Sequence, residues 1–188
     1  MKYIAKGLVE QGSTEHILKI QRGGHTFQLT GIQAGLWLNG RFGFANVEEN
    51  NPWHRKELRH LQRLGLAEVT DDSAAGEYWA LTQCVLVPAI PGKLRLLLNK
   101  QEAQTLQWLR EAGLRLTTAE LVSLEEHGVK PAPELLGEEN SQALTETIYT
   151  QENIQDHILE AQMEHAFCRD RVVNAVLGLL KKRRVLVL

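Results

Sequence analysis

Residues 54–69 read HRKELRHLQRLGLAEV, and the fold that we expect for the first half of the chain follows from their pattern. Leu58, Leu61 and Leu64 follow the spacing of one helix face, and Gly65 comes directly after them as a stop signal. The residues after the glycine have the pattern of a strand. We therefore expect an amphipathic helix that passes through a tight turn into a β-strand.

The start of this helix is marked by Asn51, a favourable N-cap, and by Pro52, which suits the first turn. The helix is thus expected over residues 52–64. At about 100° per residue, its cationic side chains gather opposite the leucines. These cations are Arg55, Lys56, Arg59 and Arg63. Glu57 is the only acid among residues 51–64, so this segment has a net charge of +3 in a chain whose net charge is −2.

The next segment reads DDSAAGEYWALT at residues 71–82. Its turn-forming residues, 71–76, are expected to join two strands, residues 66–70 and 78–87. The leucine-spaced helix, the Gly-Leu turn and this hairpin resemble the recognition helix and wing of winged helix-turn-helix proteins, such as MarR-type and PadR-type repressors. The resemblance spans residues 30–87 and implies a DNA-binding fold. Residues 39–46 depart from it, because glycines stand where a full second helix is expected.

The segments before the helix complete a first unit. A hairpin is expected over residues 16–29, around two central glycines, and a short helix over residues 32–38, capped by Thr30. Because a proline-glycine pair follows the second hairpin, we expect the first unit to cover residues 1–92.

The remaining residues, 93–188, are expected to form a second and mostly helical unit. Its expected elements are a helix over 100–112 capped by Asn99, a capping box that starts at Thr117, a helical stretch over 146–184 and a terminal strand over 185–188. The fold class is therefore α+β and mostly α.

A weak repeat links the two units. Thr30 before the helix of Trp37 corresponds to Asn99 before the helix of Trp108, and the run from helix to strand at 58–69 resembles the end of the chain. Two winged-helix-like units in tandem would explain this pattern. The alternative is that any two small helical units share capped helices and leucines.

The cationic helix predicts a function. An α-helix fits the major groove of DNA, where arginine pairs with guanine and cations neutralise phosphates. The residues expected to contact double-stranded DNA are Asn51, Arg55, Lys56, Arg59, His60 and Arg63. We therefore expect a transcriptional regulator.

Two observations keep alternatives open. The expected wing carries Asp71, Asp72 and Glu77 without any cation, so it would be repelled by phosphates. The cations of the helix could also form an ordinary solvated face. The alternative function is a winged-helix module that binds another protein and no DNA.

Charge suggests a different role for the second unit. Residues 99–165 hold four basic and thirteen acidic side chains, whereas residues 166–188 hold six basic and one acidic side chain. The acidic part should repel nucleic acid. We expect it to pair two protomers as a homodimer through the apolar residues of 148–167, or else to close an intramolecular core with them.

Other classes of function lack a signal. No nucleotide-binding, hydrolase or metalloprotease motif occurs, so we expect neither an enzyme nor a cofactor. His157, His165 and Cys168 lack a second ligand pair at metal spacing, so we expect no metal site. The cysteine usage and the lack of an export signal favour a cytoplasmic protein. The four tryptophans are expected in or at the edge of the core.

Overall fold

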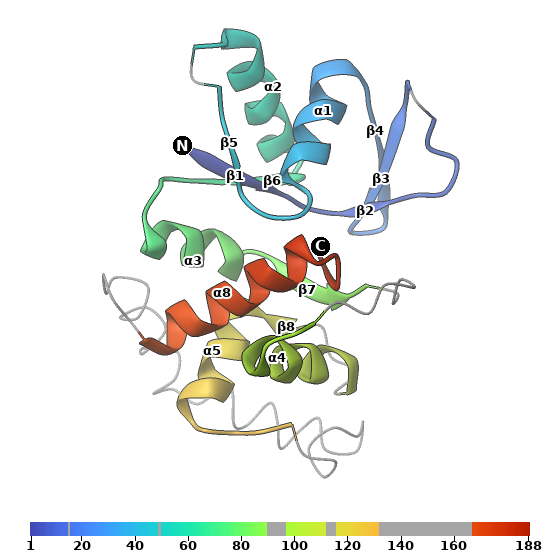
Figure 1. Cartoon of the computed structure of the whole chain (residues 1–188). Helices are drawn as coiled ribbons and strands as arrows, with labels where there is room; N and C mark the ends of the chain where they lie inside the picture. The colour runs from blue at the N-terminus through green and yellow to red at the C-terminus, as the bar shows by residue number, and fades with distance from the viewer. Residues whose placement is uncertain (15, 49, 90–96, 112–115, 132–166) are drawn as a thin grey trace. The chain divides into compact units, whose positions relative to one another are not determined.

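The computed structural model of the chain describes residues 1–14, 16–48, 50–89, 97–111, 116–131 and 167–188. These residues form an α+β fold with short sheets (Figure 1). The chain divides into two units, Met1–Asp72 with Leu186–Leu188, and Ser73–Val185. The division therefore lies after Asp72 and not near residue 92, because Pro88 belongs to a strand of the second unit.

The first unit contains two three-stranded sheets. In one sheet, the central strand β1 (Lys2–Ala5) pairs antiparallel with β5 (Ala45–Asn46) and with β6 (Ala67–Thr70). The other sheet has the order β2 (Leu8–Val9), β3 (Leu18–Arg22) and β4 (His25–Leu29), again antiparallel. The predicted hairpin over residues 16–29 is confirmed by β3 and β4. Its turn needs glycine, because both turn residues have positive φ.

Two helices of the first unit, α1 (Gly31–Gly40) and α2 (Pro52–Arg63), pack against each other (Figure 1). The predicted start of α2 is confirmed, and the helix ends at Arg63, one residue before the predicted end. The Oδ1 atom of Asn51 accepts hydrogen bonds from the backbone N–H groups of Trp53 and His54, at 3.1 and 3.3 Å, and Gly65 ends the helix with a φ of +71°. Between α1 and α2, the described residues hold β5 and no further helix.

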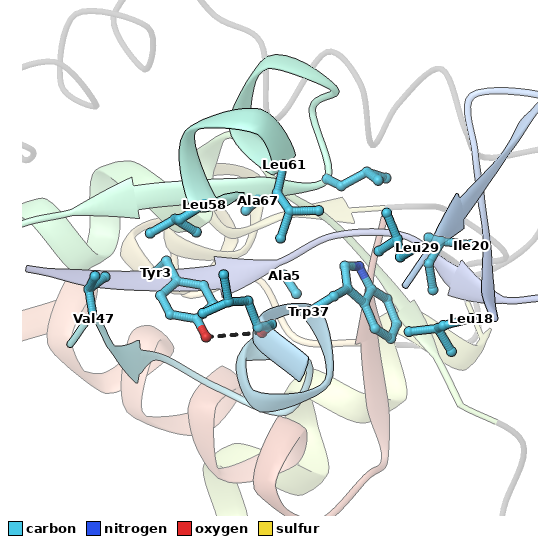
Figure 2. Close-up of a cluster of buried hydrophobic side chains, with 12 residues drawn as sticks. Tyr3, Ala5, Leu18, Ile20, Leu29, Trp37, Val47, Leu58, Leu61 and Ala67 are labelled. Carbon is cyan, nitrogen blue, oxygen red and sulfur yellow. Dashed lines mark hydrogen bonds between the residues drawn. The ribbon is translucent and has the colours of Figure 1, made fainter. Parts of the chain in front are cut away.

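The core of the first unit lies between these helices and the strands. Figure 2 shows how Leu58 and Leu61 of α2 meet side chains from the strands, together with Trp37 of α1. Its two polar groups are satisfied: the Tyr3 hydroxyl donates to the Leu36 carbonyl at 3.0 Å, and the Trp37 indole N–H donates to the Lys6 carbonyl at 2.9 Å. Burial raises the pKa of Tyr3 to about 12.

The second unit contains most of a sheet with the order β8-β7-β9, although the last residues of β9 group with the first unit. As in the sheet β5-β1-β6, the strand that comes first in the chain lies at the centre. Its strands are β7 (Val85–Pro88), β8 (Leu116–Thr117) and β9 (Val185–Val187). Its described helices are α3 (Ala74–Thr82), α4 (Lys100–Glu111), α5 (Thr118–Glu126) and α8 (Phe167–Lys181). The capping box at Thr117 is confirmed.

The predicted second hairpin is wrong. Residues 71–82 do not form a turn and a strand, because Ala74–Thr82 is helix α3. The Ser73 hydroxyl caps this helix by accepting from the Gly76 N–H at 2.9 Å, and the alanines that follow favour a helix. Tyr78 and Leu81 lie buried on one helix face. The chain therefore has no wing at these residues.

The end of the chain returns to the first unit. Leu186–Leu188 group with it, and the Gly7 N–H donates to the Val187 carbonyl at 2.9 Å. Among the residues described, no helix combines the length and the apolar character that crossing a membrane requires.

Candidate nucleic-acid interface

The outer face of α2 carries the predicted cations. Arg55, Lys56, Arg59 and Arg63 are all exposed. At about 100° per residue they fall within an arc of roughly 100° on the helix surface. The inner face is fixed by Leu58 and Leu61, which are 2% and 0% exposed. Because the inner leucines orient the helix, the four cations must point to solvent together. We call this surface the α2 face.

The four cations of the α2 face form no ion pair with any residue that the structure describes. The acid among them, Glu57, is half-buried, and its Oε2 accepts a hydrogen bond from the Gln33 amide of α1 at 2.7 Å. Glu57 is thus held by a neutral group, and with four cations and one acid residues 51–64 keep a net charge of +3.

The α2 face borders a shallow hollow of about 580 Å³. Its lining consists of Gln33, Pro52, Arg55, Lys56, Glu57, Arg59, His60 and Arg63. All of these residues come from α1 and α2 of the first unit. An anionic ligand in this hollow would meet several cations at once.

The other two predicted contact residues differ in availability. His60 is exposed beside the cations. Asn51 is half-buried, and its side-chain oxygen is already used in capping α2. His54, which is not among the predicted contact residues, lies 3.2 Å from a carboxylate oxygen of Glu48.

Trp53 was missed as a surface residue. The prediction that all four tryptophans lie in or beside the core holds for Trp37 and Trp108, but Trp53 is 61% exposed and Trp79 is 57% exposed. The Lys56 ammonium lies 5.5 Å from the centroid of the Trp53 ring, in cation-π geometry. The helix periodicity could have predicted the exposure of Trp53, because position 53 lies beside positions 56 and 60 on the outer side of α2.

The acids expected in a wing have other positions. A carboxylate oxygen of Asp72 lies 3.6 Å from the Lys2 ammonium, and the other lies 3.6 Å from the N-terminal amine. Glu77 lies in the first turn of α3. These acids therefore do not form a second arm of the site.

The basic end of the second unit is organised differently. On α8, Arg171 lies 2.8 Å from Glu125 of α5, and Lys182, just after α8, lies 2.6 Å from Glu102 of α4. Arg169 is buried and pairs with Asp170 at 2.9 Å. Arg171 and Lys182 thus join neighbouring helices of their own unit, whereas the partner of Arg169 is the next residue on the same helix.

Two further predictions fall mostly outside the residues that the structure describes. The stretch expected to pair protomers, 148–167, has only Phe167 within them, and this side chain is exposed. His157 and His165 also lie outside them. Across the described ranges, no three His, Cys, Asp or Glu side chains come together in a way that would hold a metal ion.

Comparison with family models, with curated proteins and with solved structures found no match for this chain.

Proposed function

We propose that the first unit binds double-stranded DNA through the α2 face and that the chain acts as a transcriptional regulator. The observation that carries this proposal is the set of four exposed cations on one helix, none of them ion-paired among the described residues. Unpaired cations held together repel one another, so the arrangement favours an anionic ligand. With twelve residues, α2 is about 18 Å long, a length that suits one pass through a major groove.

The side chains on the α2 face would have different roles. Arg59 and Arg63 lie one turn apart near the middle and the end of the helix, where they can reach base edges or phosphates. Arg55 and Lys56 lie in the first half and are suited to phosphate contacts. His60 can add a hydrogen bond, and Asn51 retains only its amide donor for this purpose.

We also propose that the two units are tandem copies of one winged-helix-like unit that lacks a wing. The ends of α2 and α8 support this, because their backbone hydrogen bonds correspond one to one. The Leu66 N–H donates to the Leu61 carbonyl at 2.8 Å, as the Arg184 N–H does to the Leu179 carbonyl at 2.9 Å. The residue after each helix cap, Gly65 or Arg183, has a positive φ.

The strands support the same proposal. The central strands β1 and β7 each pair with a two-residue strand, β5 or β8. The residue after β1, Lys6, donates its N–H to the Leu66 carbonyl at 2.9 Å. The residue after β7, Ala89, donates in the same way to the Arg184 carbonyl at 2.8 Å.

The experiment that tests DNA binding measures affinity against salt concentration for a labelled mixed-sequence duplex. We expect the double variant Arg59→Ala with Arg63→Ala to bind at least tenfold more weakly and to lower the slope of log affinity against log salt by about 1.8, or 0.9 for each lost phosphate contact. The matched control, Lys181→Ala with Arg110→Ala, removes the same charge from exposed positions of the second unit and should leave both quantities unchanged.

The alternative function, a protein-binding module without DNA binding, is favoured by one observation. Trp53 on α2 and Ile32 and Leu38 on α1 are large apolar side chains that are exposed in the same unit. If the wild-type chain binds the duplex no better than the double variant at any salt concentration, the DNA proposal is wrong and the protein module takes its place.

Pairing of protomers through the second unit stays a proposal, motivated by the two-fold symmetry of most operators. Sedimentation velocity at micromolar concentration tests it, and a monomer alone would refute it.

A further inference from the structure

Helix α2 exposes a large apolar side chain beside its cations. Within α2, all of which the structure describes, Trp53 is the only large apolar side chain that is exposed. It is the second residue of the helix, and the Asn51 side chain accepts a hydrogen bond from its backbone N–H. Contact between apolar surface and water is unfavourable, so an apolar group of a ligand would be a favourable partner for the exposed indole.

The indole of Trp53 lies at the α2 face. The Lys56 ammonium is 5.5 Å from the ring centroid, so the ring lies on the side of the helix that carries the cations. At 100° per residue, Lys56 is about 60° and His60 about 20° from Trp53 around the helix axis. A ligand that lies along the α2 face therefore meets the indole and the cations together.

Among the groups that duplex DNA presents in its major groove, one suits the indole. The four cations of the α2 face and His60 end in charged or polar groups, which pair with phosphates or with the hydrogen-bonding edges of bases. The apolar group in this groove is the 5-methyl of thymine. The bases of an intact duplex are stacked, so a side chain in the groove meets their edges. When a helix reads the major groove, residues near its N-terminus contact these edges, and Trp53 has such a position.

We propose that Trp53 contacts the 5-methyl group of thymine in the major groove and gives the α2 face a preference for thymine. This inference rests on the proposed DNA binding, because the cations would supply the affinity and Trp53 only a base preference. The contact is apolar and involves no counterion release. The preference should therefore be independent of salt, whereas the affinity itself should fall as the salt concentration rises.

The test compares two duplexes that differ only in this methyl group. One is an alternating A·T duplex, and the other has uracil in place of every thymine, so their charges are equal. The wild-type chain should bind the thymine duplex about fourfold more tightly for each methyl group contacted, as expected for one buried group of this size. The ratio of the two affinities should stay constant between about 50 and 200 mM salt.

Substitutions of Trp53 assign the preference to the indole. Trp53→Ala should bind the two duplexes equally, and Trp53→Phe, which keeps an aromatic ring, should retain part of the preference. The matched control is Trp79→Ala on α3, which removes a tryptophan of similar exposure, 57% against 61%, and should keep the full preference. Far-UV circular dichroism and thermal unfolding check that each variant folds.

The outcomes separate this contact from DNA binding itself. If Trp53→Ala keeps the wild-type preference, or the wild-type chain has none, while Arg59→Ala with Arg63→Ala loses affinity, the methyl contact is refuted and DNA binding by α2 stands. Tighter binding of single-stranded oligothymidine than of the duplex would also refute it, because the indole would then stack on base faces. If the wild-type chain and the Arg59, Arg63 double variant bind equally weakly, both proposals fail.

Discussion

Helices α2 and α8 end in the same way but differ on their outer surfaces. Each passes through a residue with positive φ into a strand, with Leu61 or Leu179 fully buried before the turn. On α2 the outward positions carry unpaired cations, as far as the structure describes the chain. At the end of the second unit, Arg171 and Lys182 are bound to glutamates of neighbouring helices.

This difference shows that net charge alone does not identify a binding surface. The segment around α8 has more excess positive charge than the segment around α2. Two of its cations, Arg171 and Lys182, nevertheless have glutamate partners within their own unit, where they join neighbouring helices. A ligand would have to break those ion pairs before it could use the cations. The smaller set of cations on α2 is the better candidate for a binding surface, because none of them forms an ion pair among the described residues.

The largest expected effects test whether the inner faces of the two helices are equivalent. Leu61→Ala and Leu179→Ala each remove a side chain that is fully buried, and each should lower the free energy of unfolding by about 2–5 kcal/mol. Urea unfolding measures the loss, and hydrogen exchange followed by mass spectrometry locates it in one unit. Gln62→Ala, at an exposed position of α2, is the control. The packing of the two helices would not be equivalent if Leu61→Ala and Leu179→Ala lowered the free energy of unfolding by amounts that differ by more than the experimental error.

The next effect concerns the central strands, where Tyr3 of β1 has a leucine, Leu86, as its counterpart in β7. The neutral phenol is favoured in the folded state, since burial raises its pKa from 10.0 to about 12. The neutral phenol of Tyr3 therefore contributes about 2–3 kcal/mol to the free energy of unfolding. This stabilisation is fully present below pH 10 and is lost as the pH rises towards 12. Urea unfolding from pH 8 to pH 12 should show this decline.

Tyr3→Phe is the comparison for that measurement. It should cost about 1 kcal/mol at pH 8, because the hydrogen bond to the Leu36 carbonyl is lost, but its stability should fall less between pH 10 and pH 12. Parallel declines for the two proteins would show that Tyr3 is not the group responsible.

An intermediate effect tests the ion pairs of the second unit. Lys182→Ala leaves the Glu102 carboxylate, which is 4% exposed, without its counter-ion and should cost about 1–3 kcal/mol of unfolding free energy. Lys181→Ala and Arg63→Ala remove exposed cations and should each change stability by less than about 0.5 kcal/mol. Thermal unfolding of the three variants is sufficient. If Lys182→Ala and Lys181→Ala were equally stable, the paired cation at the end of α8 would not differ in its contribution to stability from an exposed one.

The smallest effect exchanges the residues after the helix caps. Gly65 and Arg183 both have a positive φ, a conformation that costs a non-glycine residue about 1 kcal/mol. Arg183→Gly should therefore stabilise the chain by up to about 1 kcal/mol, and Gly65→Ala should destabilise it by at least as much. Opposite shifts in the thermal midpoint are expected. Shifts of the same sign would mean that the two turns are not equivalent.

Strong local signals in the sequence predicted much of the fold. The glycine pair predicted the β3–β4 hairpin, Asn51 and Gly65 predicted both ends of α2, and Thr117 predicted the capping box. Each of these residues acts on its immediate neighbours, so its effect does not depend on the rest of the chain. The positions of the four cations followed from the helix periodicity for the same reason.

The predictions that failed depended on contacts distant in the sequence. Residues 74–82 were assigned to a hairpin because Asp71, Asp72 and Gly76 suggest a turn, although Ser73 and the alanines favour a helix. Trp79 lies on the exposed side of this helix, whereas Tyr78 lies on the buried side. The ion pair between Glu102 and Lys182 joins residues far apart in the chain and had no local signal.

The backbone hydrogen bond between the Gly7 N–H and the Val187 carbonyl affects when the first unit can finish folding during translation. The strands and helices of the first unit emerge from the ribosome before any residue of β9 is translated. A nascent first unit would therefore fold while this backbone contact is still missing, and its last step would wait for synthesis of the whole second unit. Closing so long a loop is slow compared with local folding, so the completed first unit should appear late.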